Sequence, residues 1–238
     1  MSQEKVPGTS GLVKVAIVDF EMCNLFSVNQ ACEHVGLKAV ITSDRNVILK
    51  ADAIILPGVG AFGDAMSNLK RLDLIEPIKE CVAKGTSLLG ICLGMQLLFS
   101  ESEEFGTHKG LDIVKGSVVR FPVGNNTGKR IRVPHVGWNQ IRKALPTPVD
   151  SWAQTPLKNI KDGEYMYFVH SYFVKPAIPA VTLSLTDYEG IQFCSSIHYD
   201  RVFACQFHPE KSALEGIKIY KNWAGIISFT KKELSSCQ

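Results

Sequence analysis

The spacing of hydrophobic and polar positions changes about halfway along the chain. The first half alternates short apolar runs with amphipathic segments, which predicts β-strands that alternate with α-helices. Such an order is typical of parallel strands joined by right-handed crossovers. The expected strands are 14–19, 38–42, 51–56 and 87–91, and the expected helices are 24–34, 61–69, 74–84 and a segment from residue 92 or 93 to about 100.

The second half is rich in strand-like segments separated by turn residues, which predicts hairpins and an extended mixed sheet. Residues 142–163 contain three prolines and little periodicity, so we expect a surface loop there. The sequence Ser212-Ala-Leu-Glu215 matches a capping box, and we expect it to begin a final helix that continues to about residue 227. The expected strands are 113–121, 137–142, 165–174, 180–186, 192–198 and 202–207.

Length and composition favour one α/β domain over residues 12–238, preceded by a flexible lead-in at 1–11. The chain has 238 residues, of which 45% are hydrophobic and 21% charged, and its net charge is +3. Neither a run of like charges nor a long apolar stretch occurs, so we expect no nucleic-acid or membrane partner. The N-terminus has no signal-peptide pattern, which makes the cytoplasm the expected location.

Seven cysteines are present, and none forms a CxxC pair, so the sequence predicts neither a metal site nor a disulfide framework. We likewise expect no cofactor. Four cysteines lie in apolar patterns and are expected to be small core residues. They are Cys32, Cys81, Cys194 and Cys205.

Cys92 differs from the others because it lies in Gly90-Ile-Cys-Leu-Gly94, between an apolar strand and the start of a helix. This Gly-x-Cys-x-Gly pattern is the thiol form of a nucleophile elbow, in which glycines allow a sharp turn and the approach of substrate. The helix N-terminus favours the thiolate form, and the N–H of Leu93 is free to donate to an oxyanion. The pattern alone is equally compatible with a buried cysteine at a strand end.

His208 and Glu210 supply the base and the orienting group that a thiol nucleophile needs. They lie in Phe207-His-Pro-Glu210, directly after an apolar strand. We expect Glu210 to hold one imidazole nitrogen while the other faces the thiol, takes its proton and later protonates the leaving group. Alone, the motif also fits a simple turn at a strand end, but its occurrence in one chain with the cysteine elbow favours catalysis.

Several segments together resemble class I (triad) glutamine amidotransferases, and most closely the glutaminase subunits of imidazole glycerol phosphate synthases. The resemblance covers the chain from Val15 to about Trp223. It implies a single flavodoxin-like domain, with a central, mostly parallel sheet flanked by helices, that hydrolyses L-glutamine to glutamate and ammonia. The matching segments are 56–64, 89–99 with 102–104, 133–139, 167–172 and 206–212.

The resemblance also implies roles for further residues. Pro57-Gly-Val-Gly60 looks like the family's oxyanion strand, in which an N–H of Gly58 or Val59 joins that of Leu93. Glycines suit a peptide plane that must flip. Four other positions match residues that hold the amino and carboxylate groups of the substrate, although a helix surface or strand pairing would also explain them. They are Gln96, Glu104, Ser171 and Tyr172.

The resemblance implies a heterodimer with a (β/α)₈-barrel cyclase that receives the ammonia through a protected channel. Lys211, Trp138 and Asn24 match positions at or near that interface. Where the family has two glycines, the N-terminal loop here reads Asp19-Phe-Glu-Met-Cys-Asn-Leu25, with Glu21 and Cys23. These two side chains are expected to remodel the contact with a partner.

Alternative functions therefore stay open. A paralogue could supply ammonia for sugar amidation in surface-polysaccharide synthesis. The chain could instead be an inactive regulatory or scaffold subunit, although an intact Cys92, His208 and Glu210 argues against this. A cysteine peptidase on a similar fold is disfavoured by Pro57-Gly-Val-Gly60 and by Gln96. His135 and His170 lie within family motifs, where loop shaping and substrate contact are both possible.

Overall fold

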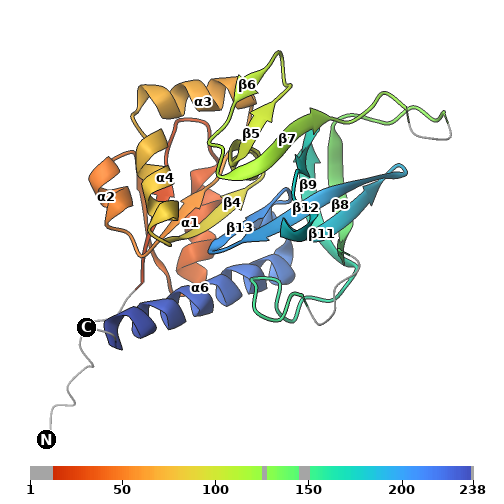
Figure 1. The fold of residues 1–238 in the computed structure, drawn as a ribbon. Helices are drawn as coiled ribbons and strands as arrows, with labels where there is room; N and C mark the ends of the chain where they lie inside the picture. Colours follow the sequence, from red (N-terminus) through yellow and green to blue (C-terminus); the bar gives the residue numbers. More distant parts are fainter. Residues whose placement is uncertain (1–12, 125–127, 145–150, 237–238) are drawn as a thin grey trace, which may run out of the picture.

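The computed structural model describes residues 13–124, 128–144 and 151–236 (Figure 1). The predicted lead-in at 1–11 and Cys237 lie outside the described residues, and so does part of each of two connecting segments. Within the described ranges, no helix is both long and apolar enough to cross a membrane.

Five parallel strands form the part of the sheet that carries the predicted nucleophile. Their spatial order is β2-β1-β3-β4-β13, so β13 joins the four strands of the first half although it comes last in the chain. All side chains of β3, β4 and β13 are buried, as expected for strands covered on both faces. The bounds are β1 Lys14–Val18, β2 Lys38–Thr42, β3 Ala53–Leu56, β4 Ser87–Ile91 and β13 Val202–Cys205.

Helices cover both faces of these strands, and each face has its own hydrophobic core. On one face, α1 and α6 pack against Val15 and Ile17, whereas the other helices pack against Ala16 and Val18 on the opposite face. The predicted α/β class is therefore confirmed. The bounds are α1 Leu25–His34, α2 Arg45–Leu49, α3 Phe62–Arg71, α4 Ile75–Ala83, α5 Leu93–Leu97 and α6 Ala213–Ser236.

The second half extends the sheet with mostly antiparallel strands. From β13 the order continues β12-β10-β7-β5-β6, while β11, β8 and β9 form a branch that starts from β12. The bounds are β5 Phe99–Ser102, β6 His108–Lys109, β7 Val114–Arg120, β8 His135–Lys143, β9 Glu164–His170, β10 Tyr172–Pro176, β11 Thr182–Tyr188 and β12 Ile191–Tyr199, with short 3₁₀ turns η1 Pro179–Val181 and η2 Pro209–Lys211.

Three element predictions were wrong in detail. The helix expected to reach residue 100 ends at Leu97, and strand β5 begins two residues later. The strand expected at 165–174 is divided at Ser171 into β9 and β10. The segment expected to be a surface loop carries Trp152, whose indole is buried and donates to the carbonyl of Leu183 at 2.9 Å, so the described part of that segment contributes to the core.

The predicted capping box is also wrong, because Ser212 uses its hydroxyl elsewhere. That hydroxyl donates to the carbonyl of His208 at 2.7 Å and accepts from the N–H of Tyr167 at 3.0 Å. It therefore ties the turn after β13 to strand β9. The final helix still begins directly after Ser212, and it continues to Ser236 rather than ending near residue 227.

Candidate active site

Cys92 occupies a strained turn between β4 and α5, as the elbow pattern predicts. Its backbone has φ 54° and ψ −110°, a conformation that residues with a side chain rarely adopt. Its N–H donates to the carbonyl of Cys205 on β13 at 2.8 Å, and this bond anchors the turn to the neighbouring strand. A strained residue held in this way at the start of a helix is typical of a functional position.

The two glycines of the elbow are required by packing. A Cβ on Gly94 would lie 1.7 Å from the carbonyl oxygen of Leu56, because α5 begins directly against the end of β3. A Cβ on Gly90 would lie 2.9 Å from the Cβ of Ala204 on β13. The glycines therefore let the nucleophile turn fit between two neighbouring strands, a reason different from the predicted approach of substrate.

His208 and Glu210 form the predicted pair immediately after β13. The Nδ1 atom of His208 lies 2.8 Å from Oε1 of Glu210, and both side chains are almost completely buried. Burial lowers the pKa of His208, but the neighbouring Cys92 and Glu210 outweigh it and raise that pKa to about 10. The Nε2 atom of His208 makes no hydrogen bond among the described residues, so it is the nitrogen available for proton exchange with the thiol.

The predicted oxyanion strand, residues 57–60, lies on the other side of Cys92. The N–H of Val59 donates to the carbonyl of Met22 at 2.9 Å, so this N–H is engaged with the N-terminal loop. Gly60 has φ 99°, and a Cβ there would lie 2.6 Å from the methyl group of Met22. Leu93, in contrast, is the first residue of α5, where N–H groups have no partner within the helix.

The side chains that replace two glycines in the N-terminal loop both make contacts. Glu21 has φ 67°, which explains why glycine suits this position, and its carboxylate pairs with exposed Arg71. Cys23 donates its thiol proton to the carbonyl of Pro57 at 3.4 Å. Burial raises the pKa of the Cys23 thiol to about 12, so it stays protonated and keeps donating. The loop is therefore held against the oxyanion strand by side chain as well as by backbone.

A cavity of about 260 Å³ opens in front of Cys92. All four predicted substrate-binding residues line it, although they come from α5, from the segment after β5 and from the β9–β10 junction. One oxygen of Glu104 is already used, because it accepts the N–H of Phe62 at 2.7 Å. The lining comprises Val59, Gly60, Cys92, Leu93, Gln96, Glu104, Pro134, Val169, His170, Ser171 and Tyr172.

Two buried histidines form a hydrogen-bonded chain behind this cavity. Because the carbonyl of Tyr172 can only accept, Nδ1 of His170, at 2.8 Å, carries a proton. Its Nε2 must then accept from Nδ1 of His135, at 3.0 Å, and the far side of His135 faces the amide of Asn139 at 3.3 Å. Burial lowers the pKa of His135 to about 4 and that of His170 to about 3, so both are neutral.

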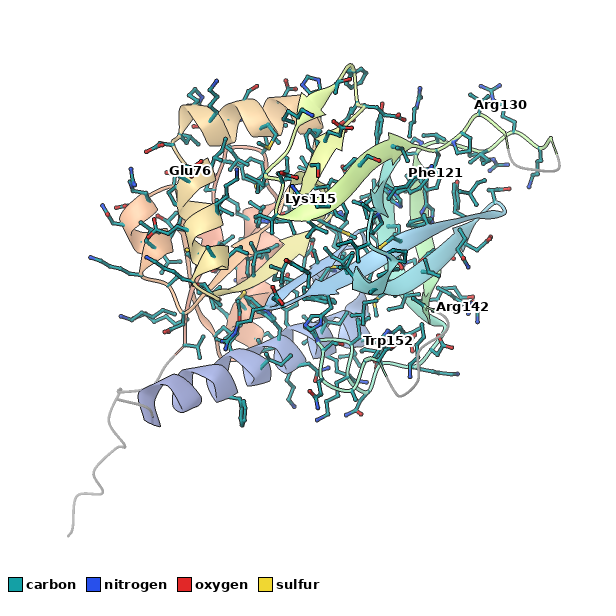
Figure 2. All side chains as sticks on the ribbon, viewed as in Figure 1. Glu76, Lys115, Phe121, Arg130, Arg142 and Trp152 are labelled. Atoms are coloured by element: carbon teal, nitrogen blue, oxygen red, sulfur yellow. The ribbon has the colours of Figure 1, made fainter. Side chains whose placement is uncertain are left out.

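Aromatic side chains hold this histidine chain in place. The ring of Phe121, labelled in Figure 2 at the end of β7, lies 5.3 Å from the ring of His170 and 4.8 Å from that of Phe173. The ring of Tyr188 stacks on His135 at 4.0 Å. His170 lines the cavity, which is compatible with substrate contact, whereas His135 is not a lining residue and contacts His170 from behind.

The three predicted interface residues differ in exposure. Lys211 is exposed, Trp138 is 52% exposed and Asn24 is partly buried. Trp138 pairs with Tyr167 in the β8–β9 ladder, and Val136 and Tyr165 occupy the same face of this ladder. We call the exposed group on that face the apolar strip: Val136, Trp138, Tyr165 and Val169.

Sequence reasoning missed two residues next to the nucleophile. The Nε2 atom of fully buried Gln206 lies 3.6 Å from Sγ of Cys92, and the carbonyl of Val169 lies 3.8 Å from the same sulfur. A glutamine at the end of an apolar strand was the available signal for Gln206. Across the described ranges, no group of three or more histidine, cysteine or acidic side chains is arranged to hold a metal.

Comparisons with known proteins agree with this geometry. A profile of the Glutamine amidotransferase class-I family matches residues 16–224. The chain is 44% identical to imidazole glycerol phosphate synthase subunit HisH of Geobacter metallireducens, over 90% of this chain and 98% of that one. It is 47% identical to the HisH subunit of Syntrophotalea carbinolica, over 88% of this chain and 98% of that subunit. The solved structure of PurLQS from Thermotoga maritima matches with a TM-score of 0.65 and 18% identity, over 90% of this chain and 98% of that one. This is a likeness of fold alone.

Proposed function

The chain belongs to the class-I glutamine amidotransferase family, and we propose that it is the glutaminase subunit of an imidazole glycerol phosphate synthase. In this role it hydrolyses L-glutamine to glutamate and ammonia and passes the ammonia to a second subunit. The observation that carries the proposal is the strained Cys92 elbow beside the buried His208–Glu210 pair, at the mouth of a cavity of about 260 Å³. Identity of 44–47% to HisH subunits over about 90% of the chain supports the pathway.

The chemistry follows from the placement of these groups. The Cys92 thiolate attacks the side-chain amide carbon of glutamine, and the imidazolium of His208 protonates the departing ammonia. Glu210 keeps His208 in the required tautomer through Nδ1. Leu93 N–H, joined by Val59 N–H once it is released from Met22, stabilises the oxyanion of the tetrahedral intermediate. Water, activated by His208, then cleaves the thioester and frees glutamate.

The cavity lining suits the two charged ends of an amino acid. Glu104 keeps one carboxylate oxygen for the substrate ammonium group, because only the other oxygen accepts from Phe62. Gln96, Ser171 and Tyr172 line the same space and supply polar atoms for the α-carboxylate and amine. One carboxylate and one side-chain amide around a small pocket favour a zwitterionic substrate over an extended peptide.

The partner we propose is a (β/α)₈-barrel cyclase, which forms imidazole glycerol phosphate and an aminoimidazole carboxamide ribotide. The apolar strip supports this heterodimer, because large apolar side chains exposed together are typical of a protein interface. The strip also adjoins the reaction, since the carbonyl of Val169 lies 3.8 Å from Cys92 Sγ. Trp138, Lys211 and Asn24 are the residues proposed to contact the barrel near the ammonia exit.

The test is glutamate release from glutamine by the purified chain, alone and mixed with the cyclase from the same organism plus its ribotide substrate. We expect a large rise on mixing, and product formation that stops with Cys92→Ala but resumes when ammonium salt is added. If glutamate release does not rise, while a glutamine-like inhibitor still alkylates Cys92, the chain is a glutaminase for another acceptor. Supply of ammonia for sugar amidation then takes first place.

A further inference from the structure

We propose that Gln206 is a catalytic residue that holds the sulfur of Cys92 and links it to the substrate-binding amide of Gln96. This inference rests on the proposed function, in which Cys92 is the nucleophile. Gln206 is fully buried directly after β13, and its Nε2 atom lies 3.6 Å from Cys92 Sγ. Its own N–H donates to the carbonyl of Ser195 at 2.9 Å, which fixes the backbone from which the side chain reaches the sulfur.

The orientation of both amides follows from one backbone carbonyl. The Nε2 atom of Gln96 lies 3.0 Å from the carbonyl oxygen of Tyr172, which can only accept. The same Nε2 lies 3.0 Å from the side chain of Gln206, so the Gln206 atom facing it must be the carbonyl oxygen. The Gln206 amino group is thereby directed at Cys92 and donates to the sulfur.

This donor is matched to a thiolate. A buried amide N–H that points at sulfur stabilises the anion in a site from which water is largely excluded, and hydrogen bonds to charged groups are the stronger ones. The series of hydrogen bonds from Cys92 through Gln206 reaches the cavity, because Gln96 lines it. The Oε1 atom of Gln96 makes no hydrogen bond among the described residues and is left for the substrate. Gln96 is thus two hydrogen bonds away from the nucleophile, and a substrate amine bound to Gln96 is three away.

The experiment measures the rate at which iodoacetamide alkylates Cys92, followed residue by residue by mass spectrometry because other cysteines are present. Gln206→Met removes the donor while nearly preserving the volume. We expect alkylation of Cys92 to slow about tenfold at pH 7, with the pH profile of the rate moved to higher pH. Gln192→Met, an exposed glutamine on β12, is the matched control and is expected to alkylate at the unchanged rate.

Gln206→Asn is the second variant, because it keeps a buried amide but withdraws it from the sulfur by one methylene. It is expected to slow alkylation to a similar degree. It provides the test if Gln206→Met does not fold. Unchanged alkylation in either folded variant, with glutamine hydrolysis lowered only through KM, would overturn the proposal and leave Gln206 as a support for Gln96. If wild-type Cys92 reacts no faster than Cys23, the proposed function itself fails, so the two failures are distinguishable.

Discussion

The end of β13 lies on one side of Cys92, and the segment 57–60 after β3 lies on the other. On the β13 side, the side chains of His208, Glu210 and Gln206 are buried and already directed at the sulfur or at each other. On the other side, Val59 is 40% exposed and its N–H is bonded to Met22 rather than facing the cavity. The proposed nucleophile therefore has its neighbours in place, whereas the proposed oxyanion site does not yet present the N–H of Val59.

This difference indicates which step a partner can control. Gln206 and His208 are buried on either side of Phe207, which belongs to the hydrophobic core that α1 and α6 cover, so moving them would disturb that packing. The proposed oxyanion strand is held to the N-terminal loop by the backbone hydrogen bond from Val59 to Met22 and by the Cys23 thiol at Pro57. We expect a peptide flip there to break mainly this contact with the loop, so the loop side is the one suited to regulation.

Removing the nucleophile tests the β13 side most severely. Cys92→Ala is expected to lower glutamine hydrolysis by about 10⁴-fold or more, because the covalent route is lost. The fold should be retained, since alanine fits the same turn and leaves the N–H bond to Cys205 in place. Glutamate release gives the activity, and thermal unfolding gives the stability. Normal turnover in this variant would remove Cys92 from the mechanism.

The junction between the two sides is tested by Gly94→Ala. Its Cβ would lie 1.7 Å from the carbonyl of Leu56, so α5 and β3 must separate, and we expect the free energy of unfolding to fall by about 3 kcal/mol. Gly225→Ala is the matched control on α6, where nothing lies within 4 Å, and should raise it by about 0.5–1 kcal/mol. Equal urea midpoints for the two variants would contradict the close approach.

The sequence predicted one side of this site better than the other. Gly-x-Cys-x-Gly and His-Pro-Glu each lie in a short segment whose local pattern sets the backbone, so Cys92, His208 and Glu210 could be recognised, and the family resemblance is confirmed. Most strands and helices were also predicted, because their apolar periods are regular. The roles of Cys92, His208 and Glu210 in catalysis stay predictions that the experiments above address.

Features that depend on tertiary pairing were not predictable. The bond from Val59 to Met22 joins residues whose contact is set by how β1 and β3 end, and no local pattern reports it. Ser212 matched a capping box, yet strand β9 supplied a competing donor through Tyr167. The burial of Trp152 depends on β11, which offers the carbonyl of Leu183. In each case a distant partner outweighed the local signal.

The buried histidine chain makes the β13 side sensitive to acid. Above about pH 6.5, His170 is neutral in both the folded and the unfolded chain, so it does not change the free energy of unfolding with pH. Below it only the unfolded chain gains the proton, until the folded pKa of about 3 is reached, so stability falls as pH falls. We expect a loss of about 2 kcal/mol at pH 5 relative to pH 7 from this residue.

Urea unfolding at pH 7 and pH 5 measures this loss. His170→Gln should reduce the difference between the two pH values, whatever its cost at pH 7. His34→Gln, at an exposed position on α1, is the control and should leave the difference unchanged. An unaltered pH dependence in His170→Gln would mean that other groups cause the acid sensitivity.

The smallest expected effect lies in the N-terminal loop, where Cys23 and Glu21 replace glycines. The two residues are expected to differ in their effect on partner-free activity. Cys23→Gly removes the thiol that donates to Pro57, so Val59 should be released more readily, and partner-free glutamine hydrolysis should rise about threefold. Glu21→Gly places a glycine at a φ of 67°, which glycine adopts without strain, and removes only the exposed ion pair with Arg71. The Cys23 thiol still holds the loop in this variant, so partner-free glutamine hydrolysis should not rise. Glutamate release by the isolated variants distinguishes these outcomes. Equal rises in both would mean that loop flexibility alone, rather than the Cys23 thiol, controls the oxyanion strand.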